Sequence, residues 1–148
     1  MSNIQKKIAI LGLGNISYEL CSSLIRKGFK VFGTTNNPER KSQLQKLGVK
    51  VFKRNKTLQC ISNSTKLIIT SPPDLRGCPV IRDYFREIVN SEIKWIGYLS
   101  STSVYGDYHG ENVNEDSDLK FSNSTAKSRR RGEQDLLDFG NKYSIPIE

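Results

Sequence analysis

The stretch Ile8-Ala9-Ile10-Leu11-Gly12-Leu13-Gly14-Asn15-Ile16-Ser17 decides how this chain folds. Its apolar beginning, bounded by Lys6 and Gly12, predicts a short buried strand. Apolar residues at helical spacing follow it: Ile16, Leu20, Cys21, Leu24 and Ile25. Gly28 comes next as a natural helix end. The chain therefore opens with a strand, a glycine turn and an amphipathic helix.

The remaining sequence alternates strand-like and helix-like segments. Strands are predicted at 30–34, 49–52, 66–70 and 94–100. Helices are predicted at 37–47, around 58–61, at 80–89 and at 124–139. This alternation predicts the α/β class, with a doubly wound parallel sheet that carries helices on both faces.

Local signals set the expected ends of these segments. Asn37-Pro38 has the form of an N-cap followed by proline at the first helical position, and Gly48 closes that helix. Gly140 is expected to stop the last helix. Residues 101–123 form a long irregular connection, and 143–147 look like the start of one more strand.

Length and composition indicate one domain, 1–148. Apolar stretches end well before the ~20 residues of a membrane span, and Met1 to Lys7 do not resemble a secretory signal, so a cytoplasmic location is expected.

Three cysteines, Cys21, Cys60 and Cys78, are far apart and never in a CxxC pair. This spacing argues against a disulfide framework and against a metal site.

The positive charge is concentrated in the first part of the chain. The net charge is +8, and Met1 to Cys60 holds twelve Lys and Arg against Glu19 and Glu39. This half should attract anions. Nucleic acid, a dinucleotide phosphate and a merely solvated lysine face all require the same sign, so charge alone leaves the three open.

The glycine turn has the features of a dinucleotide site. Such a site needs a tight turn after a strand, bare backbone near the pyrophosphate, and a helix N-terminus aimed at it. Gly12 and Gly14 supply the first two, with Asn15 and Ile16 completing the expected cofactor contacts, while Ser17 takes the third glycine position. The predicted fold is a Rossmann-type domain; the alternative is a plain strand-to-helix turn.

The region after the second strand bears on the choice between NAD and NADP. NAD-preferring sites usually place an acid about 20 residues beyond the glycines. This chain has Thr34, Thr35, Asn36 and Asn37 there, with Arg40 and Lys41 just behind. The absence of a carboxylate and the nearby cations favour NADP slightly, although Arg40 could equally be an exposed residue of a first helical turn.

Three further motifs carry a family resemblance. They are Ser71-Pro72-Pro73, the run Ser100-Ser101-Thr102-Ser103-Val104-Tyr105-Gly106-Asp107, and Gly132-Glu133-Gln134. In this order the chain resembles the extended and atypical short-chain dehydrogenases/reductases, the NAD-dependent epimerase/dehydratase superfamily, and within it a YeeZ-like subgroup. The resemblance implies an NAD(P)-binding domain in which Ser71, Pro72 and Pro73 contact the cofactor and Ser101 or Thr102 orients the substrate.

The same resemblance points to a missing catalytic pair. The family's Tyr-x-x-x-Lys falls on Thr125 and Arg129, and a threonine hydroxyl is a poor acid or base near neutrality. A weak or inactive NAD(P)-binding protein is therefore expected. Alternatives are an active reductase or epimerase using a sugar nucleotide or small carbonyl substrate, and, more remotely, a nucleic-acid or protein-binding module.

The resemblance also implies a further C-terminal region. Family members continue into a smaller part that builds most of the substrate pocket, whereas this sequence ends at Ser144-Ile145-Pro146-Ile147-Glu148. A truncated domain is expected to expose an apolar edge. Marginal stability, self-association or pairing with a separately encoded C-terminal half would follow.

Overall fold

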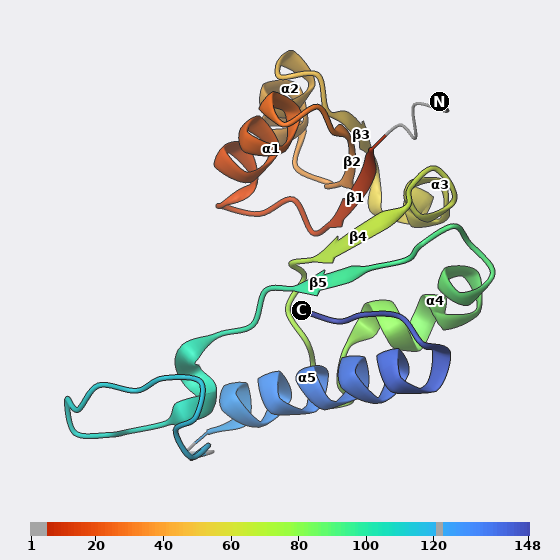
Figure 1. Ribbon diagram of the computed structural model, residues 1–148. Helices are drawn as coiled ribbons and strands as arrows, with labels where there is room; N and C mark the ends of the chain where they lie inside the picture. Colours follow the sequence, from red (N-terminus) through yellow and green to blue (C-terminus); the bar gives the residue numbers. More distant parts are fainter. Residues whose placement is uncertain (1–5, 121–122) are drawn as a thin grey trace.

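The computed structural model describes residues 6–120 and 123–148 (Figure 1). Residues 1–5, which belong to the segment judged unlike a secretory signal, lie outside the described residues. Residues 121 and 122, in the connection before the last helix, lie outside them as well.

Five parallel strands form one sheet in the order β3-β2-β1-β4-β5. The strands are β1 (Lys7–Leu11), β2 (Lys30–Thr34), β3 (Lys50–Phe52), β4 (Lys66–Ile69) and β5 (Ile96–Tyr98). The helices are α1 (Ser17–Arg26), α2 (Pro38–Lys46), α3 (Thr57–Ser62), α4 (Pro79–Val89) and α5 (Ser124–Tyr143), with short 3-10 turns η1 (Arg54–Lys56) and η2 (Thr102–Tyr105). The predicted α/β class and parallel sheet are confirmed.

The sheet separates two apolar cores. Ile8 and Ile10 of β1 pack with Cys21 of α1 and Leu44 of α2. The alternate β1 residues pack on the opposite face, in a core that contains Cys60 and Ile61 of α3, Val80 and Ile88 of α4, and Leu136 of α5. Helices thus cover both faces, as Figure 1 shows, because successive strand side chains point to opposite sides.

The local helix signals are mostly confirmed. The Asn37 side chain accepts a hydrogen bond from the Arg40 amide at 3.0 Å, and Pro38 opens α2. Gly48 follows α2 with a φ of 96°, as a helix-ending glycine should. Ile16, expected on the buried helical face, is instead 53% exposed and precedes the first residue of α1. The expected face is otherwise right, since Cys21 is fully buried.

The end predicted for the last helix is wrong. Helix α5 continues through Gly140 to Tyr143 and ends at Ser144, whose φ is 54°. Gly140 is buried, and a Cβ built on it would lie 2.4 Å from Cγ1 of Ile147. The glycine therefore lets the returning chain pack closely on the helix and does not stop it.

The segment after α5 pairs with the sheet over fewer residues than expected. The Ile96 amide donates to the Pro146 carbonyl at 3.0 Å, and the Tyr98 amide donates to the Glu148 carbonyl at 2.7 Å. These bonds and one isolated bridge, Ile96 to Ile147, place 146–148 parallel to β5. Pairing thus begins near 146 and not at 143.

Cys21, Cys60 and Cys78 are all buried and are not joined to one another. Among the described residues, none of the helices has the length and apolar character needed to cross a bilayer.

Candidate functional site

The predicted site residues gather along one edge of the sheet, where the parallel strands reach their carboxyl ends. Gly12 follows β1, Thr35 follows β2, Ser71 follows β4 and Ser101 follows β5. β1 and β4 are neighbours, but the chain continues from β1 to β2 on one side and from β4 to β5 on the other side. In open α/β sheets, ligands bind in the crevice outside such a switch point.

Gly12 is required by two independent constraints. Its φ is 107°, a conformation that side chains rarely adopt, and a Cβ there would lie 2.7 Å from the Ser71 amide nitrogen. Gly14 is under neither constraint, because a Cβ there would meet only the Gly12 carbonyl oxygen at 3.8 Å. Gly12 thus permits β1 and β4 to approach, and Gly14 leaves open space at the surface of the turn.

Leu13, between the two glycines, anchors the turn to the sheet. Its amide donates to the Thr34 carbonyl at 3.0 Å, and its side chain is buried. A Cβ on Gly33 would lie 2.7 Å from Cδ1 of Leu13, so the leucine occupies the space that Gly33 leaves free. The backbone of the turn is therefore fixed by contacts with β2.

The beginning of α1 carries unpaired backbone donors. In the described part of the chain, the amides of Gly14, Asn15 and Ile16 donate to no protein acceptor, and these three residues are exposed. Ile16 is the N-cap residue and provides no side-chain cap within the same described part. Free amides and the positive end of the helix dipole together form an anion site.

Ser17 does not block this anion site. It is 2% exposed, and its hydroxyl oxygen is buried without a hydrogen-bond partner among the described residues. The side chain is thus buried, whereas Gly14, Asn15 and Ile16 of the turn are exposed.

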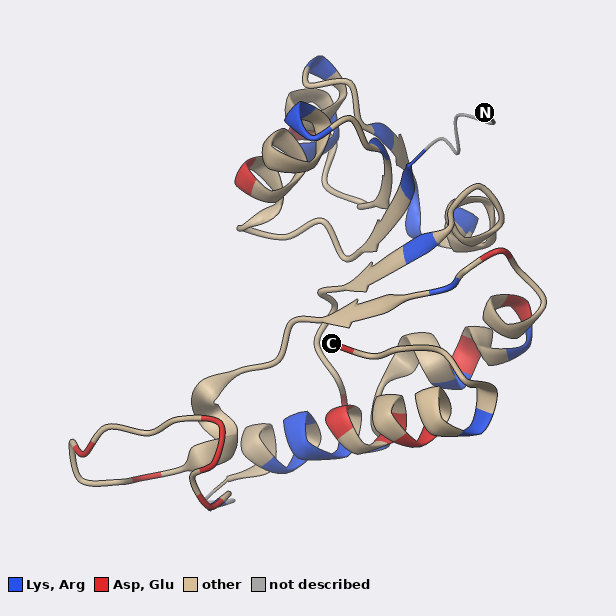
Figure 2. Ribbon diagram, in the orientation of Figure 1, with Lys and Arg blue, Asp and Glu red and all other residues tan. Residues whose placement is uncertain are grey.

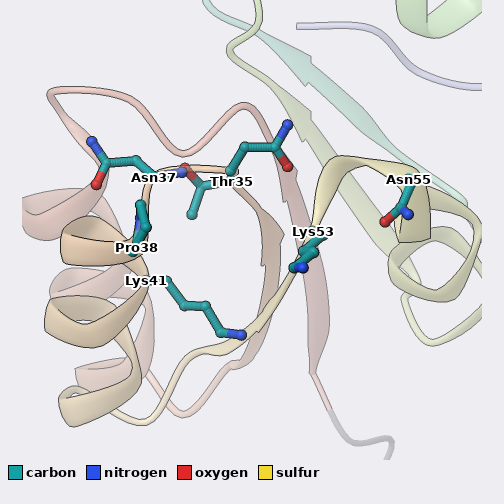
Figure 3. Close-up of a pocket in the computed structure, with 7 residues that line it drawn as sticks. Thr35, Asn37, Pro38, Lys41, Lys53 and Asn55 are labelled. Atoms are coloured by element: carbon teal, nitrogen blue, oxygen red, sulfur yellow. The ribbon is translucent and has the colours of Figure 1, made fainter.

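A pocket of about 520 Å³ lies beyond the end of β2 (Figure 3). It is lined by Thr35, Asn36, Asn37, Pro38, Lys41, Lys53 and Asn55. None of these seven lining residues is acidic, whereas Lys41 from α2 and Lys53 from the β3 end bring two cations to it. The pocket therefore favours an anionic group.

Of the residues predicted for this region, Thr35, Asn36 and Asn37 line the pocket, whereas Thr34 and Arg40 do not. Thr34 is 3% exposed and lies inside the sheet, while Thr35 lines the pocket and accepts a hydrogen bond from the Asn37 amide at 3.1 Å. Arg40 points toward the glycine turn, where its guanidinium donates to the Asn15 side chain at 3.4 Å. Arg40 thus bridges the turn and α2.

Sequence reasoning missed two pocket residues, Lys53 and Asn55. Both belong to the connection after β3, which reaches the pocket because β3 pairs with β2. The Arg54 amide also donates to the Asn36 side chain at 3.0 Å, which holds the two connections together. The signal was available in the strand order, since neighbouring parallel strands deliver their following residues to the same edge.

Ser71, Pro72 and Pro73 lie where the resemblance implies, directly after β4. The Ser71 amide donates to the Leu11 carbonyl at 3.1 Å, which holds this connection against the glycine turn. A Cβ on Gly132 of α5 would lie 2.9 Å from Cβ of Pro73. Pro73 thus packs on α5, while Pro72 is exposed beside the crevice.

The end of β5 presents hydroxyl groups with different hydrogen bonds. The Ser100 hydroxyl donates to the Glu133 carboxylate at 2.6 Å. The Ser101 hydroxyl accepts from the Ser103 amide at 3.2 Å and caps η2, whereas Thr102 is exposed. Ser101 therefore keeps its own proton available for another acceptor.

The two positions of the family's catalytic pair lie on the N-terminal part of α5. Thr125 is exposed in the first turn, and the Arg129 guanidinium donates to the Leu99 carbonyl at 3.4 Å. Burial raises the pKa of the nearby Tyr98 phenol, and Arg129 offsets this rise only in part. Tyr98 is thus a weaker acid than a free tyrosine.

Two arginines of the run Arg129-Arg130-Arg131 on α5 pair with carboxylates of the same helix. Arg130 lies 3.7 Å from Glu133, and Arg131 lies 3.2 Å from Asp135. This arrangement is typical of a solvated helix face. Within residues 6–120 and 123–148, His, Cys, Asp and Glu side chains form no group of three that could hold a metal ion.

Comparison with known protein families gives one match. Residues 7–75 match the family described as NADP oxidoreductase, coenzyme F420-dependent. The matched segment contains the glycine turn, the pocket beyond β2 and Ser71 to Pro73. No curated protein matches the chain.

Solved structures resemble the chain over nearly its whole length. A functionally unknown conserved protein from Silicibacter pomeroyi DSS superposes with a TM-score of 0.84 at 26% identity, covering 97% of this chain and 50% of that one. Vestitone reductase from alfalfa (Medicago sativa L.) gives 0.76 at 19% identity, covering 97% and 55%. UDP-glucose 4-epimerase from Bifidobacterium longum, in complex with NAD+ and UDP, gives 0.75 at 19% identity, covering 96% and 51%.

The chain spans about half the length of each of these three structures. The superpositions show that this chain shares its fold with these structures. This chain thus has a Rossmann-type fold.

Proposed function

We propose that this protein binds NADP or NAD, with the diphosphate at the turn formed by Gly12, Gly14, Asn15 and Ile16. The free amides at the start of α1 carry this proposal, because their residues are exposed and the amides have no protein acceptor in the described chain. The match of this segment to an NADP oxidoreductase family supports it independently.

The pocket beyond β2 would hold the adenosine ribose and would favour NADP slightly over NAD. Thr35, Asn36 and Asn37 offer uncharged hydrogen-bonding groups, while Lys41 and Lys53 offer cations to a 2′-phosphate. In NAD-preferring sites a carboxylate at this place accepts the ribose hydroxyls. Arg40, which lies beside Asn15 of the glycine turn, would contact the cofactor from that turn.

We propose weak or absent turnover for the chain in its present form. Thr125 and Arg129 stand where the resemblance implies Tyr-x-x-x-Lys, and the buried Tyr98 has a raised pKa. An active reductase or epimerase acting on a sugar nucleotide or small carbonyl compound is the second candidate. Ser101 favours it, since its hydroxyl proton remains free to polarise a carbonyl at the end of β5.

A thermal melt with each dinucleotide tests the binding proposal. A ligand that binds only the folded state must raise the melting temperature, so both dinucleotides should do so, NADP more strongly. The variant K41Q/K53Q should weaken NADP binding by about tenfold and leave NAD binding within about twofold, in accord with the loss of charge-assisted contacts to a phosphate. The matched control R76Q/K142Q removes two cations far from the pocket.

Two outcomes would contradict these statements separately. An unchanged melting temperature at millimolar concentrations of both dinucleotides would overturn the cofactor proposal. Tighter binding of NAD than of NADP would overturn only the stated preference. Cofactor turnover with a panel of ketones and nucleotide sugars, abolished in S101A, would support the second candidate over a weak or inactive protein.

A further inference from the structure

A row of lysines follows the amino edge of the sheet, opposite the candidate dinucleotide site. Each of the first four strands begins with a lysine, and a fifth lysine comes two residues before β5: Lys7, Lys30, Lys50, Lys66 and Lys94. Figure 2 shows blue segments where the strands begin. Adjacent strands lie about 4.8 Å apart, so these cations follow one another along the edge, with Lys7, Lys30 and Lys50 on one face of the sheet and Lys66 on the other.

Neighbouring segments add charge of the same sign. The last turn of α1 and the residue after it contribute Arg26 and Lys27, and α2 contributes Lys46. The connections that enter β2 to β5, residues 27–29, 47–49, 63–65 and 90–95, contain a single carboxylate, that of Glu92. Among the salt bridges of the described residues, none involves a cation of this edge.

The strand register brings like charges together. Lys7 and Lys30 are direct partners across β1 and β2, so they lie side by side on one face of the sheet. Lys50 pairs with Phe32, two residues beyond Lys30, and therefore shares that face. Like charges opposite each other destabilise a sheet. Helix dipoles account for cations at helix ends but not for three lysines on one sheet face.

Aromatic rings accompany the lysines. The ammonium groups lie 5.6 Å from the Phe29 ring for Lys6, 5.6 Å from the Phe52 ring for Lys50, and 5.1 Å from the Trp95 ring for Lys66. All three rings are only partly buried. Phe29 and Trp95 pack against the core on the α1 side of the sheet and Phe52 packs against the opposite core, and each ring keeps an exposed part that a base can contact.

We propose that this amino edge, defined by Lys7, Lys30, Lys50, Lys66 and Lys94 with the rings of Phe29, Phe52 and Trp95, binds single-stranded nucleic acid. The lysines neutralise successive phosphates and the rings stack on bases, without reading the sequence. A single strand fits better than a duplex, because base pairs in a duplex keep their faces stacked on one another. An acidic protein would use the charges but leave the rings without a role.

Fluorescence anisotropy with a labelled mixed-sequence single-stranded oligonucleotide tests this proposal. The variant K7Q/K30Q/K50Q should lose at least about tenfold in affinity, and the salt dependence of log K should fall by about 2, since each phosphate contact contributes about 0.7. F52L, which keeps apolar volume but removes a ring face, should lose about fivefold.

The control variant R76Q/K127Q/R131Q removes the same charge from the connection before α4 and from the N-terminal half of α5. It should retain the affinity of the unaltered protein within about twofold, because a strand bound at the amino edge makes few contacts there. A melt of each variant confirms folding; if K7Q/K30Q/K50Q does not fold, K66Q/K94Q makes the same test on the other side of β1.

Four results would overturn the proposal. They are undetectable binding at about 50 mM salt, an equal loss in the control variant, displacement of the oligonucleotide by excess NADP, and equal or tighter binding of the matching duplex. Because the two sites lie at opposite edges of the sheet, failure here would leave the dinucleotide proposal intact, and the reverse also holds.

Discussion

The carboxyl ends of β1 and β5 lie at the same edge of the sheet but differ in which features of a dinucleotide enzyme they present. After β1, the turn retains the positive φ of Gly12, the open space at Gly14 and the free amides of α1. After β5, the hydroxyl-rich turn is present, yet Thr125 and Arg129 occupy the positions implied for the proton-exchanging pair.

This difference separates binding from chemistry. An anion site built from backbone amides depends on chain geometry, which many sequences can preserve. Proton exchange depends on the pKa of one side chain, and a single substitution removes it. The β1 end should therefore tolerate changes in side-chain chemistry but not in backbone shape, and the β5 end should behave in the opposite way.

The largest effect is expected from Gly12→Ala at the β1 end. The added methyl group would lie 2.7 Å from the Ser71 amide nitrogen at a φ of 107°, so the free energy of unfolding should fall by about 3 kcal/mol. Urea unfolding measures this change.

Gly14→Ala is the matched control for Gly12→Ala. Its methyl group meets its nearest atom at 3.8 Å, so stability should change by less than about 0.5 kcal/mol, while NADP affinity should fall at least about tenfold. Equal stability losses in the two variants would break the distinction between a structural and a binding glycine.

An alkaline titration compares the two apolar layers that lie on either side of the sheet. Burial raises the pKa of Cys21, in the α1 layer, to about 11 and that of Cys60, in the opposite layer, to about 12. The folded state keeps both thiols neutral, whereas the unfolded chain ionises them above about pH 9. Stability should therefore be unaffected by these thiols below pH 9 and should fall as pH rises toward 11 and 12.

Each thiol should contribute about 1.4 kcal/mol per pH unit within its window. Urea midpoints measured from pH 8 upward give the change in the free energy of unfolding per pH unit. Cys60→Ala should remove the part of this change that Cys60 contributes. A slope identical in Cys60→Ala and the unaltered protein would show that the layer formed by α3 is more open to water than the buried thiol indicates.

The smallest effect concerns Ser17, the one departure of the β1 end from the glycine motif. Ser17→Ala removes a buried hydroxyl that lacks a partner and should raise stability by about 1 kcal/mol without changing NADP affinity. Ser42→Ala, at an exposed position of α2, reports the gain from helix propensity alone. Weaker NADP binding in Ser17→Ala would mean that the hydroxyl serves the ligand.

Features set by neighbouring residues were predictable from the sequence. The strand before Gly12, the Asn37-Pro38 cap and the helical face of α1 around Cys21 all follow from local spacing and backbone preference. Gly140 was misread because its reason is tertiary: it makes room for Ile147 after the chain turns back. A glycine that permits close packing and a glycine that ends a helix look alike in sequence.

The position of the candidate site was predictable from the sequence, but the full set of residues that line it was not. Thr35, Asn36 and Asn37 were expected, whereas Lys53 enters the pocket only because β3 pairs with β2. The in-register lysines Lys7 and Lys30 likewise become neighbours only when the strand order is known. Contacts between segments distant in sequence require the topology, which local patterns do not contain.

The anchoring of Leu13 has a consequence for how fast a dinucleotide could associate. Because this side chain fills the space above Gly33 and its amide is bonded to Thr34, the loop between the glycines is already shaped before any ligand arrives. A preorganised loop loses less conformational entropy when the ligand binds than a flexible loop would. Association should then approach an encounter-limited rate, with little induced rearrangement.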